Sequence, residues 1–410
     1  MGTRTRLAVM MALAYAVQGA WWPVLSVHLK DLGGSGRGRG WIFATLAIAA
    51  LISPPLAGRI ADRRLSAQKL LAILYAIGSA LLAVMASGRF VTFSGLFPLF
   101  LVYWLLIIPY LGLINTVAMR NLESPSTQFG GIRLWGTVGW MVVGWLVSAV
   151  MWAREGPSLR VAAHESFLIG SGISAVLAVF CLFLPDTPPL ASGRKGLPIK
   201  EAVEMLRRPG VLVLLIAGFG VSLTTPFVYQ AVPAYLYDIG MPRNRIASAM
   251  TLGQVPEILM LGILPLVLER LGRRNTMILG IGAWIAYHGA FAMQPGAYLA
   301  LLVIPLNGVA IALFHITAPM YLDSQAPPDR RAGMQGLWVM TTSGLGSLVG
   351  GLLAGEVMER ASSDWRLVFA IPAGIAACFL AVFVLAFWPK SASAAEPRTS
   401  FRPCGAGVGE

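Results

Sequence analysis

Residues 91–119 read VTFSGLFPLFLVYWLLIIPYLGLINTVAM, a stretch that contains no charged side chain. A helix needs about 20 consecutive apolar residues to cross the hydrocarbon core of a membrane, which is about 30 Å thick. Similar apolar runs recur along the chain, and they are longer than the strands of a membrane barrel, which have about ten residues. We therefore predict an all-α membrane protein with twelve transmembrane helices, at 7–29, 41–61, 68–87, 91–119, 130–152, 164–184, 210–238, 246–268, 275–294, 297–322, 332–355 and 366–388.

The composition excludes an ordinary soluble protein. Charged residues make up 12% and hydrophobic residues 57% of the 410 residues, whereas a soluble domain has about 25% charged residues. The net charge of +13 does not indicate a nucleic-acid partner, because Lys and Arg lie between apolar runs without an aromatic-interleaved basic stripe. Cys181, Cys378 and Cys404 lack the spacing of a metal site or a disulfide framework. We expect no metal and no cofactor.

The longest polar interval runs from Pro185 to Pro209 and divides the predicted helices into two sets of six. We predict an N-terminal six-helix bundle at 1–184, a cytoplasmic linker at 185–209, a C-terminal six-helix bundle at 210–388 and a disordered cytoplasmic tail at 389–410. The tail is rich in Ala, Ser, Gly and Pro and cannot bury enough apolar surface to become ordered. Two bundles joined by a charged segment are typical of transporters in which one bundle rocks against the other.

The distribution of Lys and Arg predicts the orientation in the membrane. Most of the 31 Lys and Arg residues fall in the intervals that share a side with both termini. Cytoplasmic loops carry an excess of these residues. We therefore expect both termini in the cytoplasm and a plasma membrane location, which is the inner membrane in a Gram-negative bacterium. The bilayer is an expected partner, and we predict a monomer.

A short motif recurs between the second and third helices of each half, as GRIADRR at 58–64 and LERLGRR at 268–274. Acidic and basic side chains there can form a latch at helix ends, where helix dipoles add to the attraction. The alternative is a basic cytoplasmic loop with a turn glycine. The first copy resembles the loop motif of the major facilitator superfamily, which makes Gly58, Asp62 and Arg63 candidates for a gating loop.

Glu257 is the carboxylate that lies deepest in a predicted helix. A charge near the bilayer centre costs at least about 2.5–3.5 kcal/mol on insertion scales, so such a residue is a functional candidate. Gln254 precedes it by three residues and shares its helix face, and Pro256 loosens the helix there. We interpret Glu257 as a proton carrier or a substrate acceptor. The alternative is a structural carboxylate paired with an arginine.

The fifth predicted helix carries a second polar face. Arg133, Thr137 and Trp140 follow one another at i, i+4 and i+7, so their side chains lie on one stripe. A guanidinium, a hydroxyl and an indole would suit a polar aromatic ligand. The alternative is an arginine that extends to the cytoplasmic interface.

Further polar candidates lie in the seventh and tenth predicted helices. Tyr229 and Gln230 lie between Pro226 and Pro233, and discontinuous helices near the midplane often line transport sites. Asn307 and His315 stand two turns apart on similar faces of the tenth helix. Ordinary packing remains the alternative for each of these residues, and for His315 above all.

The chain resembles the nucleoside–proton symporter family of the major facilitator superfamily. The matching segments are QGAW at 18–21, PYLGLINT at 109–116, IRLWGT at 132–137, QVPE at 254–257 and RAGMQG at 331–336. The resemblance implies the major facilitator fold and the import of nucleosides together with protons. It also implies that Arg133, Thr137, Trp140, Gln254 and Glu257 line the nucleoside site, where the aromatic ring stacks on the base.

The sequence departs from the family at some of these places. Pro226 and Tyr229 stand where the family has amides, and Asn307 stands where it has a tyrosine. Ala312 replaces an aspartate of the family. We therefore predict that Glu257, together with His315, carries the proton.

Three other functions stay open. One is a major facilitator permease for another small solute, such as a sugar or a drug. A membrane-embedded enzyme would need a catalytic set such as HExxH or Ser/His/Asp, which we do not find, so we predict no enzymatic activity. A non-transporting receptor would bind its ligand without taking it up.

Overall fold

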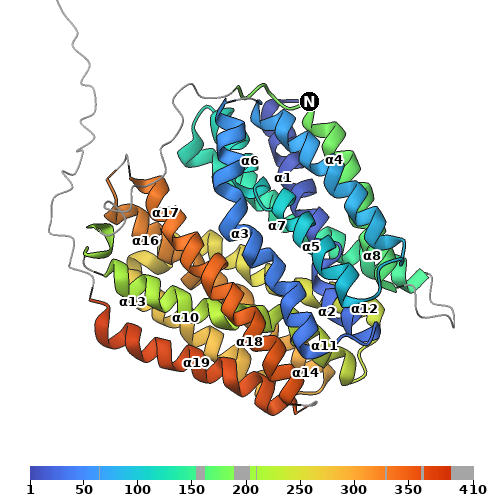
Figure 1. The fold of residues 1–410 in the computed structure, drawn as a ribbon. Coiled ribbons are helices and arrows are strands. Elements are labelled where there is room, and N and C mark those ends of the chain that lie inside the picture. Colours follow the sequence, from blue (N-terminus) through green and yellow to red (C-terminus); the bar gives the residue numbers. More distant parts are fainter. Residues whose placement is uncertain are drawn as a thin grey trace, which may run out of the picture.

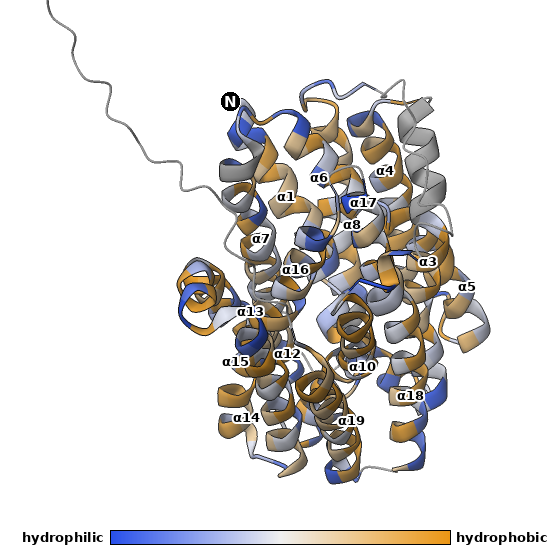
Figure 2. Ribbon diagram, turned by 90° about the vertical axis from the view of Figure 1, so that its left-hand side faces the viewer, coloured by the Kyte–Doolittle hydropathy of each residue, from blue (hydrophilic) through white to orange (hydrophobic). Residues whose placement is uncertain are grey.

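A computed structural model describes residues 1–63, 65–153, 162–188, 204–208, 210–327, 330–361 and 364–388. Its regular elements in these ranges are helices. Ten helical segments are long and apolar enough to cross a membrane. Hydrophobic residues predominate along the helices (Figure 2), and large side chains such as Leu302 (72% exposed) and Leu385 (77%) are exposed. The predicted class, an all-helical membrane protein, is confirmed.

The first group of helices runs from Thr3 to Cys181, and we call it the N-terminal helix group (Figure 1). Its long helices pack side by side, with α1 against α7 and α8, α4 against α8, and α3 against α5. The elements are α1 (Thr3–Gly19), η1 (Trp22–Val24), α2 (Leu25–Asp31), α3 (Gly36–Arg63), α4 (Ala67–Ala86), α5 (Phe93–Ile107), α6 (Tyr110–Arg120), α7 (Pro125–Ala153) and α8 (Ala162–Cys181).

The second group, the C-terminal helix group, runs from Val211 to Ala386 and lies beside the first (Figure 1). Within it α13 packs against α15 and α19, and α10 packs against α18 and α19. The elements are α10 (Val211–Gln230), α11 (Val232–Asp238), α12 (Arg243–Met250), η2 (Thr251–Gly253), α13 (Gln254–Ala292), α14 (Ala297–Val303), α15 (Pro305–Ala310), η3 (Ile311–Ile316), α16 (Thr317–Gln325), α17 (Arg331–Val339), η4 (Met340–Gly346), α18 (Ser347–Arg360) and α19 (Trp365–Ala386).

Several predicted helices are interrupted rather than continuous. Proline lacks a backbone N–H, so it removes a helical hydrogen bond, and breaks fall beside Pro23, Pro109, Pro233 and Pro305. The segments η3 and η4 are π-helical, a wider form that is frequent at functional sites. The sequence pattern marks where these helices lie but does not reveal their π-helical segments.

The two copies of the recurring motif adopt different structures. Gly272 of the second copy has φ 72° and ψ 163°, a backbone conformation that glycine adopts without strain, and it divides the 50-residue segment Arg243–Ala292. In the first copy α3 continues to Arg63. Gly58, Asp62 and Arg63 therefore belong to the end of a helix and not to a loop, and their side chains lie outside the described part.

Arg274 of the second copy binds the end of α19. Its Nε donates to the carbonyl of Phe387 (2.8 Å) and its Nη2 to that of Val384 (2.6 Å). Its guanidinium also lies 4.3 Å from the centre of the Trp388 ring. The last carbonyls of a helix lack helical partners and carry partial negative charge. This arginine thus binds a helix end through carbonyl groups, whereas the predicted latch would use an acidic side chain.

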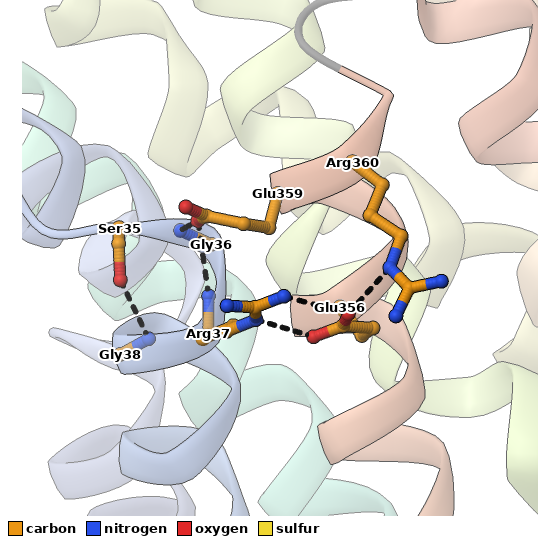
Figure 3. Close-up of polar contacts among 7 residues, drawn as sticks. All are labelled: Ser35, Gly36, Arg37, Gly38, Glu356, Glu359 and Arg360. Carbon is orange, nitrogen blue, oxygen red and sulfur yellow. Dashed lines mark hydrogen bonds and ion pairs between the residues drawn. The ribbon is translucent and has the colours of Figure 1, made fainter.

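The two helix groups meet at one end through α3 and α18 (Figure 3). Arg37 makes two hydrogen bonds to Glu356, at 2.6 and 3.0 Å. The Glu359 carboxylate accepts hydrogen bonds from the first backbone N–H groups of α3, at Gly36 (2.5 Å) and Arg37 (3.4 Å). A Cβ atom on Gly40 would lie 2.9 Å from the carbonyl oxygen of Gly351. The backbones of α3 and α18 therefore touch, as small residues permit in membrane helices.

Two more ion pairs cross between the groups nearby. Lys30 of α2 pairs with Asp238 of α11, and Arg243 of α12 pairs with Asp31 at 2.6 Å. We call this region the Arg37–Glu356 end. The helix α3 begins at Gly36, five residues before the span predicted at 41–61, and so includes Arg37 and Arg39. The predicted helix started at residue 41 because only its apolar part was recognised. Arg37 and Arg39 lie in the additional turn before this part.

Candidate functional site: a polar aromatic cluster between the helix groups

The predicted polar face of α7 is turned toward the protein. Thr137 is buried, and Arg133 and Trp140 are half-buried. A Cβ atom on Gly19 of α1 would lie 3.1 Å from the Trp140 ring, so the indole packs directly on α1. Other tryptophans of α7 face outward, with Trp135 50% and Trp152 71% exposed. The i, i+4, i+7 spacing therefore predicts the side of α7 that contacts other helices.

Arg133 lies against an aromatic residue that the sequence argument did not select. Its guanidinium carbon is 4.3 Å from the centre of the Tyr15 ring on α1. This position turns the arginine toward α1. Tyr15 precedes Gln18 by three residues and so shares its helix face, which is the signal that could have identified it.

Glu257 lies in the first turn of α13 and is half-buried. It forms no ion pair within 4.0 Å in the described part of the chain, but Arg133 interacts with it electrostatically. The helices that carry these two residues, α7 and α13, are in contact although they belong to different helix groups. The alternative of a carboxylate tied up in a salt bridge is therefore not what the geometry shows.

Three aromatic rings converge from different elements. The Tyr229 ring of α10 lies 6.4 Å from that of Trp140 and 6.1 Å from that of Trp22, which belongs to η1. Tyr229 also interacts electrostatically with Glu257. Aromatic rings at such distances offer faces and edges on which a planar group can pack. Trp22 directly follows the QGAW segment at 18–21, and its ring belongs to the same cluster.

Asn307 and Gln254 lie next to the start of α13. The Asn307 side chain is buried, and its Oδ1 has no hydrogen-bond partner in the described part. Its Nδ2 would be 3.3 Å from a Cβ on Gly253, which places it one turn from Glu257. The amide of Gln254 faces the carbonyls of Met250 and Thr251, to which its nitrogen can donate at 3.2 and 2.9 Å.

Two predicted site residues point elsewhere. The Gln230 side chain is fully buried, and its Nε2 donates to the carbonyl of Gly351 on α18 (3.2 Å). His315 lies in η3 with its ring 5.6 Å from Trp284 and 5.5 Å from Phe314. Its Nε2 is buried and without a partner among the described residues. The neighbours of these two side chains are packing partners and not Glu257.

The cluster therefore offers hydrogen-bond donors, hydrogen-bond acceptors and ring faces. Arg133 and Thr137 supply hydrogen-bond donors, Glu257 and Asn307 supply acceptor oxygens, and Trp140 and Tyr229 supply rings. Among the described residues no three His, Cys, Asp or Glu side chains gather to hold a metal ion. Such a set suits reversible binding of a planar polar molecule.

Comparison with known proteins identifies the family of the chain. The profile of a family described as nucleoside H+ symporter matches residues 1–392. The chain belongs to the nucleoside–proton symporter family. It is 35% identical over 372 residues to YegT of Escherichia coli K12, a proposed nucleoside transporter, covering 88% of this chain and 85% of YegT. It is 28% identical to the nucleoside permease NupG of the same organism, covering 93% of this chain and 96% of NupG.

The fold of this symporter family has been solved. A crystal structure of a NupG mutant superimposes with a TM-score of 0.84 at 27% identity, covering 94% of this chain and 100% of that one. A POT family transporter, at 12% identity and a TM-score of 0.72, shares the fold. Family and fold identify a transporter of the major facilitator superfamily and not an enzyme.

Proposed function

We propose that the protein imports nucleosides together with protons and that the cluster around Arg133, Trp140 and Glu257 is the nucleoside site. The observation that carries this proposal is the meeting of α7 and α13 from different helix groups, with Arg133 and Glu257 interacting across them without an ion pair. A charged pair left unbonded inside a membrane protein is costly unless a ligand uses it.

The base would lie on the rings of Trp140 and Tyr229, whose centres are 6.4 Å apart. Arg133 and Thr137 would donate hydrogen bonds to the acceptor atoms of the nucleoside, and the side-chain oxygens of Gln254, Glu257 and Asn307 would accept from its hydroxyl or amino groups. Such polar groups reject ligands that lack the matching partner, because they would then remain buried and unpaired. Gln230 would act indirectly, by fixing the end of α10 that carries Tyr229.

The architecture we propose is twelve transmembrane helices in two six-helix bundles, at 1–184 and 210–388, joined by a linker at 185–209 and followed by a tail at 389–410. The ten segments become twelve when Arg243–Ala292 is divided at Gly272 and α3 is added. Transport would occur as the two bundles rock around the site, so that it opens to one side at a time. Most of the linker and the tail lie outside the described residues.

We place both termini in the cytoplasm of a plasma membrane protein that acts as a monomer. The Arg37–Glu356 end then faces outward. Because α3 and α18 are in contact there, the structure corresponds in this proposal to a state closed to the outside. Gly58, Asp62 and Arg63 would act at the opposite end, as a gate on the cytoplasmic side.

Glu257 would carry the coupled proton, with His315 as a second candidate. Ala312 occupies the place of the family's aspartate, so another titratable group has to carry the proton. Glu257 fits better, because it interacts with Arg133 and Tyr229 of the cluster, whereas His315 lies beside Trp284 and Phe314.

Uptake into proteoliposomes tests the proposal. Purified protein should accumulate labelled uridine when the outside is acidic, and unlabelled nucleosides should compete while sugars should not. Competition by sugars alone would establish a permease for another solute. Binding without uptake would establish a receptor.

A further inference from the structure

The Arg133 guanidinium lies over the ring of Tyr15. The guanidinium carbon lies 4.3 Å from the ring centre, well within the roughly 6 Å range of a cation–π contact. The two residues are on α1 and α7, which pack against each other. One side of the guanidinium is therefore occupied by the Tyr15 ring.

Gly136 provides the space for this contact. A Cβ atom at Gly136 would lie 2.7 Å from a carbon of the Tyr15 ring and 3.1 Å from Nη1 of Arg133. A carbon atom cannot approach a ring that closely, so any other residue would displace the ring or the guanidinium. Gly136 thus leaves room on α7, beside Arg133, for the ring of Tyr15.

A row of tyrosines holds Tyr15 from behind. The Tyr110 ring of α6 meets Tyr15 edge-on, with centres 6.1 Å apart and planes at 72°. Tyr75 of α4 meets Tyr110 in the same manner, at 6.1 Å and 69°. Tyr75 and Tyr110 are buried. Edge-to-face pairs of this kind add to the packing energy, so the ring that contacts Arg133 is backed by fixed neighbours.

We propose that Tyr15 is a positioning residue for nucleoside binding: it fixes the plane of the Arg133 guanidinium so that its N–H edge is presented to the ligand. The inference rests on the proposed function. Arg133 belongs to the proposed nucleoside site, and the helix α7 that carries it contacts α13, which carries Glu257. A guanidinium held in its binding orientation loses less conformational freedom when the ligand binds.

The test is a double-mutant cycle on nucleoside binding to the purified full-length protein, measured with inosine and uridine. Tyr15→Leu should raise Kd by roughly 3- to 30-fold, the range expected from loss of a cation–π contact. Tyr15→Phe should raise Kd less than Tyr15→Leu does, because the ring is retained and only the hydroxyl is removed. In an Arg133→Leu background, Tyr15→Leu should cause no further loss, since the two residues act as one unit.

Tyr235→Leu is the matched control. Tyr235 is also buried, but its ring packs on Phe291 and Phe369 and not on Tyr15 or Arg133, so its effect on Kd should be small and should be the same with and without Arg133→Leu. Melting temperatures identify any variant that fails to fold. Equal and additive losses for Tyr15→Leu and Tyr235→Leu would overturn the inference, because Tyr15 would then have only a packing role. Failure of the wild-type protein to bind nucleosides would instead overturn the proposed function itself.

Discussion

Arg133 and Glu257 interact across the boundary between the two helix groups without forming an ion pair. Arg133 is held on α7 by the ring of Tyr15, and Glu257 lies in the first turn of α13. Opposite charges on two moving parts attract each other, and a direct ion pair would hold those parts together. An unbonded pair instead leaves both groups available to a ligand that bridges them and to the proton that neutralises the carboxylate.

Glu257→Gln should separate binding from coupling. The amide keeps the shape and an acceptor oxygen but cannot exchange a proton, so we expect nucleoside binding to stay within about tenfold, the cost of one hydrogen bond. Uphill accumulation driven by an acidic exterior should be lost, whereas exchange of labelled for unlabelled nucleoside across the membrane should continue. Both are measured in proteoliposomes. Accumulation equal to that of the wild type would contradict a coupling role for Glu257, and His315→Gln would then be the next variant to examine.

Trp140→Leu should weaken nucleoside binding. Stacking of a base on an aromatic side chain contributes about 1–3 kcal/mol, so we expect Kd to rise by roughly 5- to 150-fold, while Trp140→Phe should recover most of the affinity. Trp135→Leu is the control, because Trp135 lies on the same helix but is 50% exposed on the outer surface. Isothermal titration of the purified variants measures the difference, and equal effects at both positions would argue against stacking.

The apolar runs alone predict the helices and their approximate places, because lipid requires long uninterrupted stretches of apolar side chains. They do not predict how those helices bend. Pro109 separates α5 from α6, whereas Pro226 lies inside the continuous helix α10, since a membrane helix tolerates proline where neighbouring groups satisfy the freed backbone.

Helical spacing likewise predicts the face shared by Arg133, Thr137 and Trp140. It does not predict which residues of other helices contact that face. Tyr15 reaches Arg133 only because Gly136 has no side chain, which depends on how α1 packs on α7. Gln230 was a reasonable candidate by its position next to Tyr229. Successive side chains of a helix point in different directions, and that of Gln230 binds α18.

Arg274→Gln should destabilise the protein without changing nucleoside affinity. Arg274 binds the final carbonyls near α19, and a cation at a helix C-terminus contributes about 0.3–2 kcal/mol. We expect a lower melting temperature in detergent, with partial recovery in Arg274→Lys, which keeps the charge. Arg270→Gln is the control, since Arg270 belongs to the same motif but has an exposed side chain. A melting temperature unchanged by Arg274→Gln would show that the contact contributes no net stability.

Gly40→Val should open the Arg37–Glu356 end. A Cβ at Gly40 would meet the backbone of Gly351 at 2.9 Å and that of Gly355 at 3.0 Å, so a branched side chain would force α3 and α18 apart. The closed state then becomes less stable, and each loss of about 1.4 kcal/mol shifts the population tenfold toward the open state. Access is measured with a cysteine introduced at position 229, in a background with the native cysteines replaced by serine. In the Gly40→Val variant this cysteine should react faster than in the parent protein with an impermeant thiol reagent added on the side of the Arg37–Glu356 end.

Gly38→Val provides the matched control for this variant. Gly38 lies on the same helix, but a Cβ there would approach only Ser35 and Phe93, at 3.3 and 3.6 Å, and neither belongs to α18. Its thiol reactivity at position 229 should equal that of the parent protein. Glu359→Gln should fall between the two glycine variants, because it weakens the hydrogen bonds at the start of α3 without adding bulk. If Gly40→Val and Gly38→Val react alike, the contact between α3 and α18 does not control access from this end, since only one of the two substitutions disturbs it.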